Sequence, residues 1–246
     1  MSLPKIDVPV YSTKLISTGK TVKYRAFTVK EEKLFLMANE SEEVDTVIDS
    51  IKQVLNNCIV TKGINVEELP LFDIEYLFLK LRAVSIGEVV NLRYKCNNIL
   101  PKLNEEEEEK KCNHIVEIDL NLNEITPENI KIDNTIQITD TMGVTMKYPT
   151  FDLLRNFDAN QEVDSIIKMT VKCIDFIYDK DNVYYSKDAK EQELIDFVES
   201  MQTKDLEKIK DFFSSMPKLK KQLDFNCVKC GYGEKIELEG IQSFFA

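Results

Sequence analysis

The stretch FNCVKCGYGEKIELEG, residues 225–240, carries the pattern from which the rest of this chain is interpreted. Cys227 and Cys230 stand three positions apart, so that two thiolates can bind one metal ion from a tight turn, and the glycines that follow allow the backbone to bend. Redox pairs share this spacing, but they open a helix within a βαβ unit. Here the pair stands between a basic loop and a short expected strand at residues 235–238, which favours a metal site.

A closed structural zinc site takes four ligands, so this pair needs two more. Cys96 and Cys112 are the candidates, because each stands at the end of an expected strand. Between them lies an acidic excursion that includes Glu105–Glu109, whose mutual repulsion predicts a solvated, exposed tip. If the excursion loops out, the two thiols meet at the neck of a β-hairpin. The predicted zinc ligands, arranged as a split zinc ribbon, are Cys96, Cys112, Cys227 and Cys230.

Four thiolates around one zinc ion leave no position for water, so the pattern predicts structural zinc and no catalytic residues. The metal would fasten the C-terminal segment to a hairpin more than a hundred residues earlier in the chain. Three alternatives stay open: His114 replaces a cysteine, a three-ligand site with water serves a zinc enzyme, or the cysteines only pack. Cys58 and Cys173 lie on apolar helix faces, where a thiol behaves as a small core residue.

Hydrophobic periodicity on either side of the cysteines predicts an α+β protein. An N-terminal β-hairpin turns at Ser17–Lys20, and a capping box of Thr28 and Glu31 opens the next helix. Further helices are expected at residues 42–58, 71–84, 163–177, 189–201 and 203–216, and strands at 89–94 and 115–122. We expect one domain over residues 1–246. Its sub-elements are 1–88 (hairpin plus helices), 89–123 (β-hairpin with acidic tip), 149–216 (helical region) and 217–246 (cysteine knuckle and tail).

The hairpin turn also looks like the end of a phosphate-binding loop, because it reads Ser-Thr-Gly-Lys-Thr over residues 17–21. That motif needs a glycine five residues before Gly19, where this chain has Lys14. Both flanking segments also alternate as strands do. A hairpin turn is therefore predicted here rather than a nucleotide site.

Composition narrows the function further. The 246 residues include 43 acidic and 32 basic side chains, a net charge of −11 that disfavours binding to nucleic acid or to an anionic membrane. No apolar run is long enough to span a bilayer, and the first residues lack the apolar core of a signal peptide. We therefore expect synthesis in the cytoplasm with reduced thiols, which makes the six cysteines metal ligands or core residues before disulfides.

Three stretches together resemble a known family. They are YSTKLISTGKTVKYRAFTVKEEKLFLMANES (11–41), LPLFDIEYLFLKLRAVSIGEVVNLRYKC (69–96) and FNCVKCGYGEKIELEGIQSFF (225–245). In this order they are similar to the baseplate hub subunit and hub assembly proteins of T-even-type contractile-tailed bacteriophages. The resemblance implies a non-enzymatic protein that contacts other hub proteins, in the host cytoplasm during assembly and in the virion tail baseplate. A permanent subunit and a transient assembly factor both fit it.

A different class, a zinc-ribbon protein that binds nucleic acid, is the alternative. Residues 217–235 carry an excess of three positive charges, from Lys218, Lys220, Lys221, Lys229 and Lys235 against Asp224 and Glu234. The acidic chain and the lack of interleaved aromatic residues that could stack on bases count against it. The apolar end with Ile241, Phe244 and Phe245 either docks on a partner or packs on its own domain. The sequence does not fix the oligomeric state, and a homo-oligomer is among the states it allows.

Overall fold

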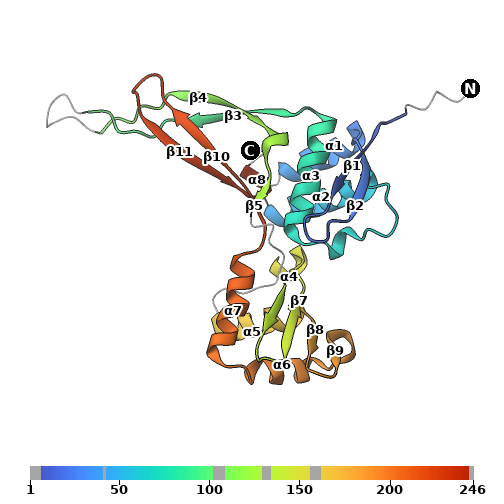
Figure 1. Cartoon of the computed structure of the whole chain (residues 1–246). Helices are drawn as coiled ribbons and strands as arrows, with labels where there is room; N and C mark the ends of the chain where they lie inside the picture. Colours follow the sequence, from blue (N-terminus) through green and yellow to red (C-terminus); the bar gives the residue numbers. More distant parts are fainter. Residues whose placement is uncertain (1–6, 41–42, 102–108, 129–133, 156–161, 244–246) are drawn as a thin grey trace, which may run out of the picture.

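The structure, a computed structural model, is α+β as predicted, and its N-terminal β-hairpin is present. It describes residues 7–40, 43–101, 109–128, 134–155 and 162–243. Figure 1 shows three parts: a body of helices and a hairpin, a β-arm that projects from the body, and a lobe drawn below both. We define them as the body (10–85), the arm (89–128 with 218–243) and the lobe (134–214).

The body pairs a hairpin with amphipathic helices. Its elements are β1 (Val10–Lys14), β2 (Thr21–Arg25), α1 (Val29–Asn39), α2 (Val44–Cys58), η1 (Val66–Glu68) and α3 (Leu71–Ser85). The predicted capping box begins α1, where the Thr28 N–H donates to the Glu31 carboxylate at 2.7 Å. Ile51 and Leu55 of α2 are almost fully buried, and Cys58 lies in the same core, as its helical spacing predicted.

The turn between β1 and β2 confirms the hairpin and binds a carboxylate of its own chain. Gly19 has a φ of +67°, a conformation that glycine adopts without strain. The amides of Ile16 and Ser17 donate to Asp73 Oδ1 at 2.6 and 3.2 Å, and the Ser17 hydroxyl donates to the other oxygen. Asp73 belongs to α3 and is fully buried, so this contact fixes the turn against the central helix of the body.

The arm contains two antiparallel strand pairs that project to the same side of the body (Figure 1) and pack together through apolar side chains of both pairs. Its elements are β3 (Val89–Lys95), β4 (Ile115–Asn121), η2 (Leu122–Glu124), β5 (Pro127–Glu128), β10 (Lys218–Asn226), β11 (Gly233–Glu239) and α8 (Gly240–Ser243). β3 pairs with β4 along its whole length, and β10 lies between β11 and β5.

The strand β10 corrects the prediction of a basic loop before the cysteine knuckle. Leu219, Leu223 and Phe225 are buried on one face, while lysines stand between them. Those lysines are neutralised across the sheet, since Lys220 contacts Glu237 at 2.7 Å and Glu239 at 2.8 Å. Cross-strand charge pairs of this kind favour a strand that its lysine content alone disfavours. Phe244 and Phe245 lie outside the described residues.

The lobe wraps helices around an antiparallel sheet of order β6-β7-β8-β9. Its elements are β6 (Thr135–Gln137), β7 (Gly143–Met146), α4 (Phe151–Arg155), α5 (Glu162–Cys173), β8 (Ile174–Tyr178), β9 (Val183–Tyr185), η3 (Ser186–Asp188), α6 (Glu191–Glu199) and α7 (Thr203–Ser214). The predicted helix through Ile177 is wrong beyond Cys173, where IDFIY forms β8. Short apolar runs rich in β-branched and aromatic residues suit a strand as well as a helix face.

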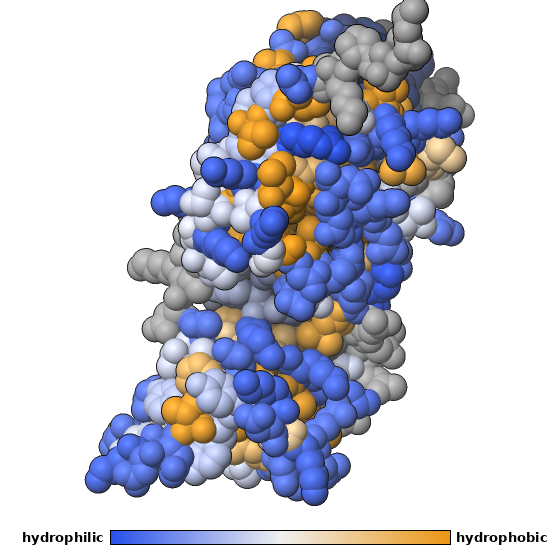
Figure 2. Space-filling view, turned by 90° about the vertical axis from the view of Figure 1, so that its right-hand side faces the viewer, coloured by the Kyte–Doolittle hydropathy of each residue, from blue (hydrophilic) through white to orange (hydrophobic). Residues whose placement is uncertain are grey.

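Separate hydrophobic clusters hold these parts, and α3 joins two of them. Ile74 and Leu77 face the core of the body, whereas Leu79 and Ala83 pack with the arm. The lobe has a core of its own, which includes the buried Cys173, as predicted. On the side that Figure 2 shows, hydrophilic residues dominate and apolar residues stand among them. Among the described helices, none has both the length and the hydrophobicity that a membrane span requires.

Candidate metal centre

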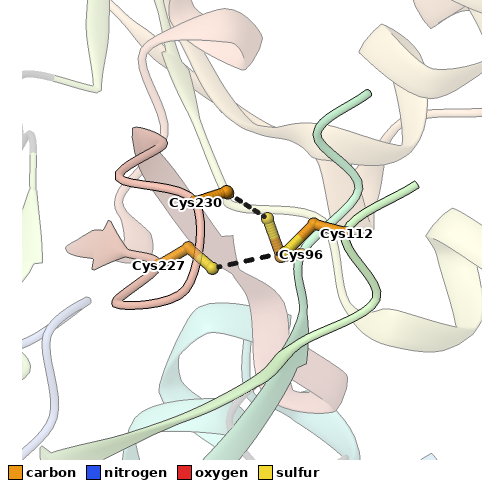
Figure 3. A group of neighbouring side chains, drawn as sticks. All are labelled: Cys96, Cys112, Cys227 and Cys230. Carbon is orange, nitrogen blue, oxygen red and sulfur yellow. Dashed lines mark hydrogen bonds between the residues drawn. The ribbon is translucent and has the colours of Figure 1, made fainter. Parts of the chain in front are cut away.

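The four predicted ligands meet at the far end of the arm. Cys96 follows the last residue of β3, and Cys112 stands three residues before β4 begins. Cys227 follows β10 directly, and Cys230 lies three residues before β11. Each strand pair therefore presents two thiols from the same end, and Figure 3 shows the two loops facing each other. Because β10 contacts both β11 and β4, the packing of the arm brings the loops together.

The sulfur atoms lie close enough together to share one metal ion. All four Sγ atoms lie within 4.8 Å of one another. Cys96 Sγ is 3.6 Å from Cys230 Sγ, and Cys112 Sγ is 3.7 Å from Cys227 Sγ. Four zinc–sulfur bonds of about 2.3 Å in tetrahedral geometry place the sulfurs about 3.8 Å apart. The cluster is thus close to the geometry of a closed thiolate site.

Backbone hydrogen bonds fix the N-terminal pair. The Cys96 N–H donates to the His114 carbonyl at 2.8 Å, and the Asn113 N–H donates back to the Cys96 carbonyl at 3.0 Å. The Cys112 N–H donates to the Asn98 carbonyl at 2.9 Å. Asn113 has a φ of +53°, a left-handed conformation that asparagine tolerates better than most residues. His114 therefore contributes its carbonyl oxygen to the turn, and it is not in the group of side chains that could share a metal.

The C-terminal pair sits in a tight knuckle. The Cys227 N–H donates to the Tyr232 carbonyl, and the Gly231 N–H donates to the Cys227 carbonyl, both at 2.8 Å. Gly231 has a φ of +74°, so this turn needs the glycine that the sequence supplies after the second cysteine. The backbone is thereby shaped so that both sulfurs point to the same side (Figure 3).

Burial raises the pKa values of these thiols, and hydrogen bonds to the sulfur atoms from N–H groups lower them. Burial raises the pKa of Cys96 to about 12 and also raises the pKa of Cys112. The pKa of Cys230 is lowered to about 6, because the Tyr232 N–H donates to its sulfur and the Asn98 side chain, 3.6 Å away, does the same. The spacing of the cysteines did not predict the contact between Asn98 and Cys230. The only feature of the sequence that could have indicated it is the polar residue two positions after Cys96.

The acidic excursion continues the β3–β4 pairing beyond the cysteines. Ile99 forms a β-bridge with Lys111, and the Leu100 N–H donates to the Lys110 carbonyl at 2.9 Å. The neck of the predicted hairpin is therefore closed on both sides of Cys96 and Cys112. Glu109 is exposed, as expected of the acidic tip, and Glu105–Glu108 lie outside the described residues.

The lysines that suggested nucleic-acid binding are largely engaged elsewhere. Lys218 and Lys220 contact Glu239, and Lys221 contacts Glu124 at 3.3 Å. Lys229 donates to the Cys112 carbonyl at 3.4 Å, which ties one loop of the cluster to the other. These contacts remove much of the local positive charge that a phosphate backbone would meet.

Fold and cluster together define an α+β protein whose projecting β-arm ends in four cysteines arranged as in a structural metal centre. A family model described as T4 bacteriophage base plate protein matches residues 8–246. The match covers nearly the whole chain, so this chain belongs to that family and has a structural role in the phage baseplate. Neither the curated proteins nor the solved structures include a match to it.

Proposed function

We propose that this chain is a non-enzymatic protein of the baseplate hub, either a structural subunit or an assembly factor, that acts by contacts with other hub proteins. The observation that carries the proposal is the family match over residues 8–246. The order of the three stretches at 11–41, 69–96 and 225–245 supports the hub in particular. On this proposal residues 1–246 act as one baseplate domain, made in the host cytoplasm and carried into the tail.

Mass spectrometry of tails and of partially assembled hubs tests this proposal. A fixed stoichiometry in both samples is the result expected of a structural subunit. Presence in the intermediates alone is the result expected of an assembly factor. Absence from both would overturn the assignment to the hub, because a protein of either kind must occur in at least one of the two samples.

We further propose that Cys96, Cys112, Cys227 and Cys230 bind one structural zinc ion. The sulfur separations and the two preorganised loops support this, since four thiolates in tetrahedral geometry are a preferred zinc environment. Zinc would then join the loop after β3 to the loop after β10, and its binding free energy would become folding free energy of the arm. All four positions around the ion would be taken by sulfur, which leaves none for a catalytic water.

Metal content of the purified chain tests the zinc site. The unaltered protein should contain stoichiometric zinc, and Cys230→Ser should lose it. Cys173→Ala is the matched control, because Cys173 is buried in the lobe and should leave the zinc content unchanged. Cobalt substitution adds an independent measurement, since a tetrahedral thiolate site gives strong visible absorption. Full zinc retention in Cys230→Ser, or a cobalt spectrum without thiolate bands, would contradict the site.

A further inference from the structure

A cavity of about 290 Å³ lies where the body, the arm and the lobe meet. Its walls come from α3 of the body, from the start of β10 and the end of β11 in the arm, and from α4 of the lobe. A cavity of about 150 Å³ with apolar walls can hold a benzene ring, so this one has room for an aromatic side chain. Its apolar lining residues include Leu71, Phe72, Leu154, Met216 and Leu219.

The charged groups of the arm at this cavity favour an apolar occupant. Lys218 contacts Glu239 at 3.1 Å, so these two lining residues neutralise each other. A charged occupant would have to compete with this ion pair and lose its own hydration. An apolar ring meets neither obstacle, and its burial removes apolar surface from water on both sides of the contact.

The helix α8 begins at the wall of the cavity. Its first residue, Gly240, lines the cavity together with Glu75 of α3, and α8 contacts α3, β10 and β11 (Figure 1). Ser243 Oγ donates to the Glu239 carbonyl at 2.8 Å, which is the spacing of one helical turn. Among the described residues, a Cβ atom at Gly240 would come within 4 Å only of Glu75 Oε1, at 3.5 Å. Glycine therefore leaves open space on this side of α8.

The next residue after the described part of α8 is Phe244, four positions after Gly240. Side chains four positions apart lie on the same side of a helix, and each leans toward the helix N-terminus. One further residue of helix would therefore place the Phe244 ring over Gly240, directed back toward the cavity. Phe245 would be turned about 100° from Phe244 around the helix axis.

We propose that the side chain of Phe244 fills this cavity and thereby joins the body, the arm and the lobe. The ring would lie against Leu71 and Phe72 of the body and against Met216 at the start of the arm. The chain's own phenylalanine is favoured over a segment of another protein, because its attachment beside the cavity gives it a high effective concentration. This inference is independent of the assignment to the hub and of the zinc site.

The methyl group of Met216 reports on the occupant, because Met216 lines the cavity. In the full-length chain labelled with carbon-13 at the methionine methyl groups, an aromatic ring beside Met216 displaces its NMR resonance. Phe244→Leu should move this resonance by several linewidths. Phe245→Leu, the matched control, should leave it in place. The resonance of Met37, which is 60% exposed on α1, should stay unchanged in both variants.

Dilution distinguishes the chain's own Phe244 from that of a second copy. An intramolecular contact does not depend on concentration, so the Met216 resonance should keep its position over a hundredfold dilution. A position that changes on dilution would assign the ring to a second copy and overturn the proposal. An unmoved Met216 resonance in Phe244→Leu, or equal displacement in Phe244→Leu and Phe245→Leu, would overturn it as well. Both substitutions keep a large apolar side chain, so circular dichroism should show the same fold in each.

Discussion

At the scale of single residues, two carboxylates of the body show how this acidic chain uses its negative charge. Asp73 accepts the amides of Ile16 and Ser17, which are the donors that a phosphate-binding turn would offer to a ligand. The anion is therefore part of the protein. Burial raises the pKa of Asp73, while its hydrogen bonds oppose that rise. The turn that resembles a nucleotide-binding loop over residues 17–21 therefore forms its hydrogen bonds with Asp73 of α3.

Glu31 should make the stability of the body depend on pH. Desolvation raises its pKa, but the hydrogen bonds from Arg25 and Thr28 outweigh this effect and set the pKa at about 2, below the ordinary 4.5. The folded state thus favours the charged carboxylate, and this stabilisation is present above pH 4.5 and lost as the pH falls toward 2. We expect Glu31→Gln to lower the free energy of unfolding by about 2 kcal/mol at neutral pH.

Urea unfolding of both proteins across the acid range measures this dependence. The difference between the unaltered chain and Glu31→Gln should shrink as the pH falls, because only the carboxylate loses its charge. Glu40→Gln, the same change at an exposed residue just after α1, should have little effect at any pH. A difference that stays constant down to pH 2 would mean that Glu31 contributes by shape and not by charge.

At the scale of elements, the sequence predicted those whose pattern is local. The buried face of α2, the hairpin β1–β2 and the pairing of β3 with β4 all follow from residues close in the chain. The strand β10 could not be predicted in the same way. Its lysines need Glu237, Glu239 and Glu124 as neighbours, and those contacts exist only after folding.

The four cysteines were predictable because ligand chemistry restricts both residue type and position. Cys96 and Cys112 were recognisable as strand ends, and Cys227 with Cys230 as a knuckle. The structure brings all four together. Asn98 and the carbonyl of His114 were not predicted, since a residue that orients a ligand through one hydrogen bond leaves no spacing rule behind.

The short helix α4 attaches the lobe to the body through the aromatic ring of Phe151 and through ion pairs. Phe151 is buried in the core of the body, and Lys52 contacts both Glu67 and Asp152 beside it. Phe151→Ala should lower the free energy of unfolding by about 3 kcal/mol, because it leaves a cavity. Lys52→Met should change it by less than about 1 kcal/mol, since both carboxylates are half exposed and methionine keeps the apolar stem.

Urea unfolding followed by circular dichroism compares these two variants directly. Phe151→Leu is the matched control for the aromatic ring, because it fills much of the same volume and should restore most of the lost stability. If Lys52→Met were as costly as Phe151→Ala, the ion pairs would hold α4 to the body as strongly as the ring does.

At the scale of the whole molecule, the arm differs from the other parts in what holds its far end. The body and the lobe each bury a large apolar cluster. The cluster at the end of the arm consists of Phe225 and three cysteines, with partly buried neighbours. Such a small cluster supplies little hydrophobic free energy, so a metal bond there would matter more than anywhere else in the chain.

Metal removal should therefore loosen one part of the molecule and leave two intact. In a strong chelator, hydrogen exchange at the amides of Cys227 and Gly231 should accelerate by a factor on the order of 1000, because their hydrogen bonds close the knuckle only while the sulfurs are held. Exchange in α2 and in α5 should stay within about twofold, since both helices pack in cores far from the cysteines. Uniform acceleration along the whole chain would instead mean that body, arm and lobe unfold as one unit. Unchanged exchange in the arm would mean that packing alone holds the thiols in position. That result would contradict a structural role for zinc.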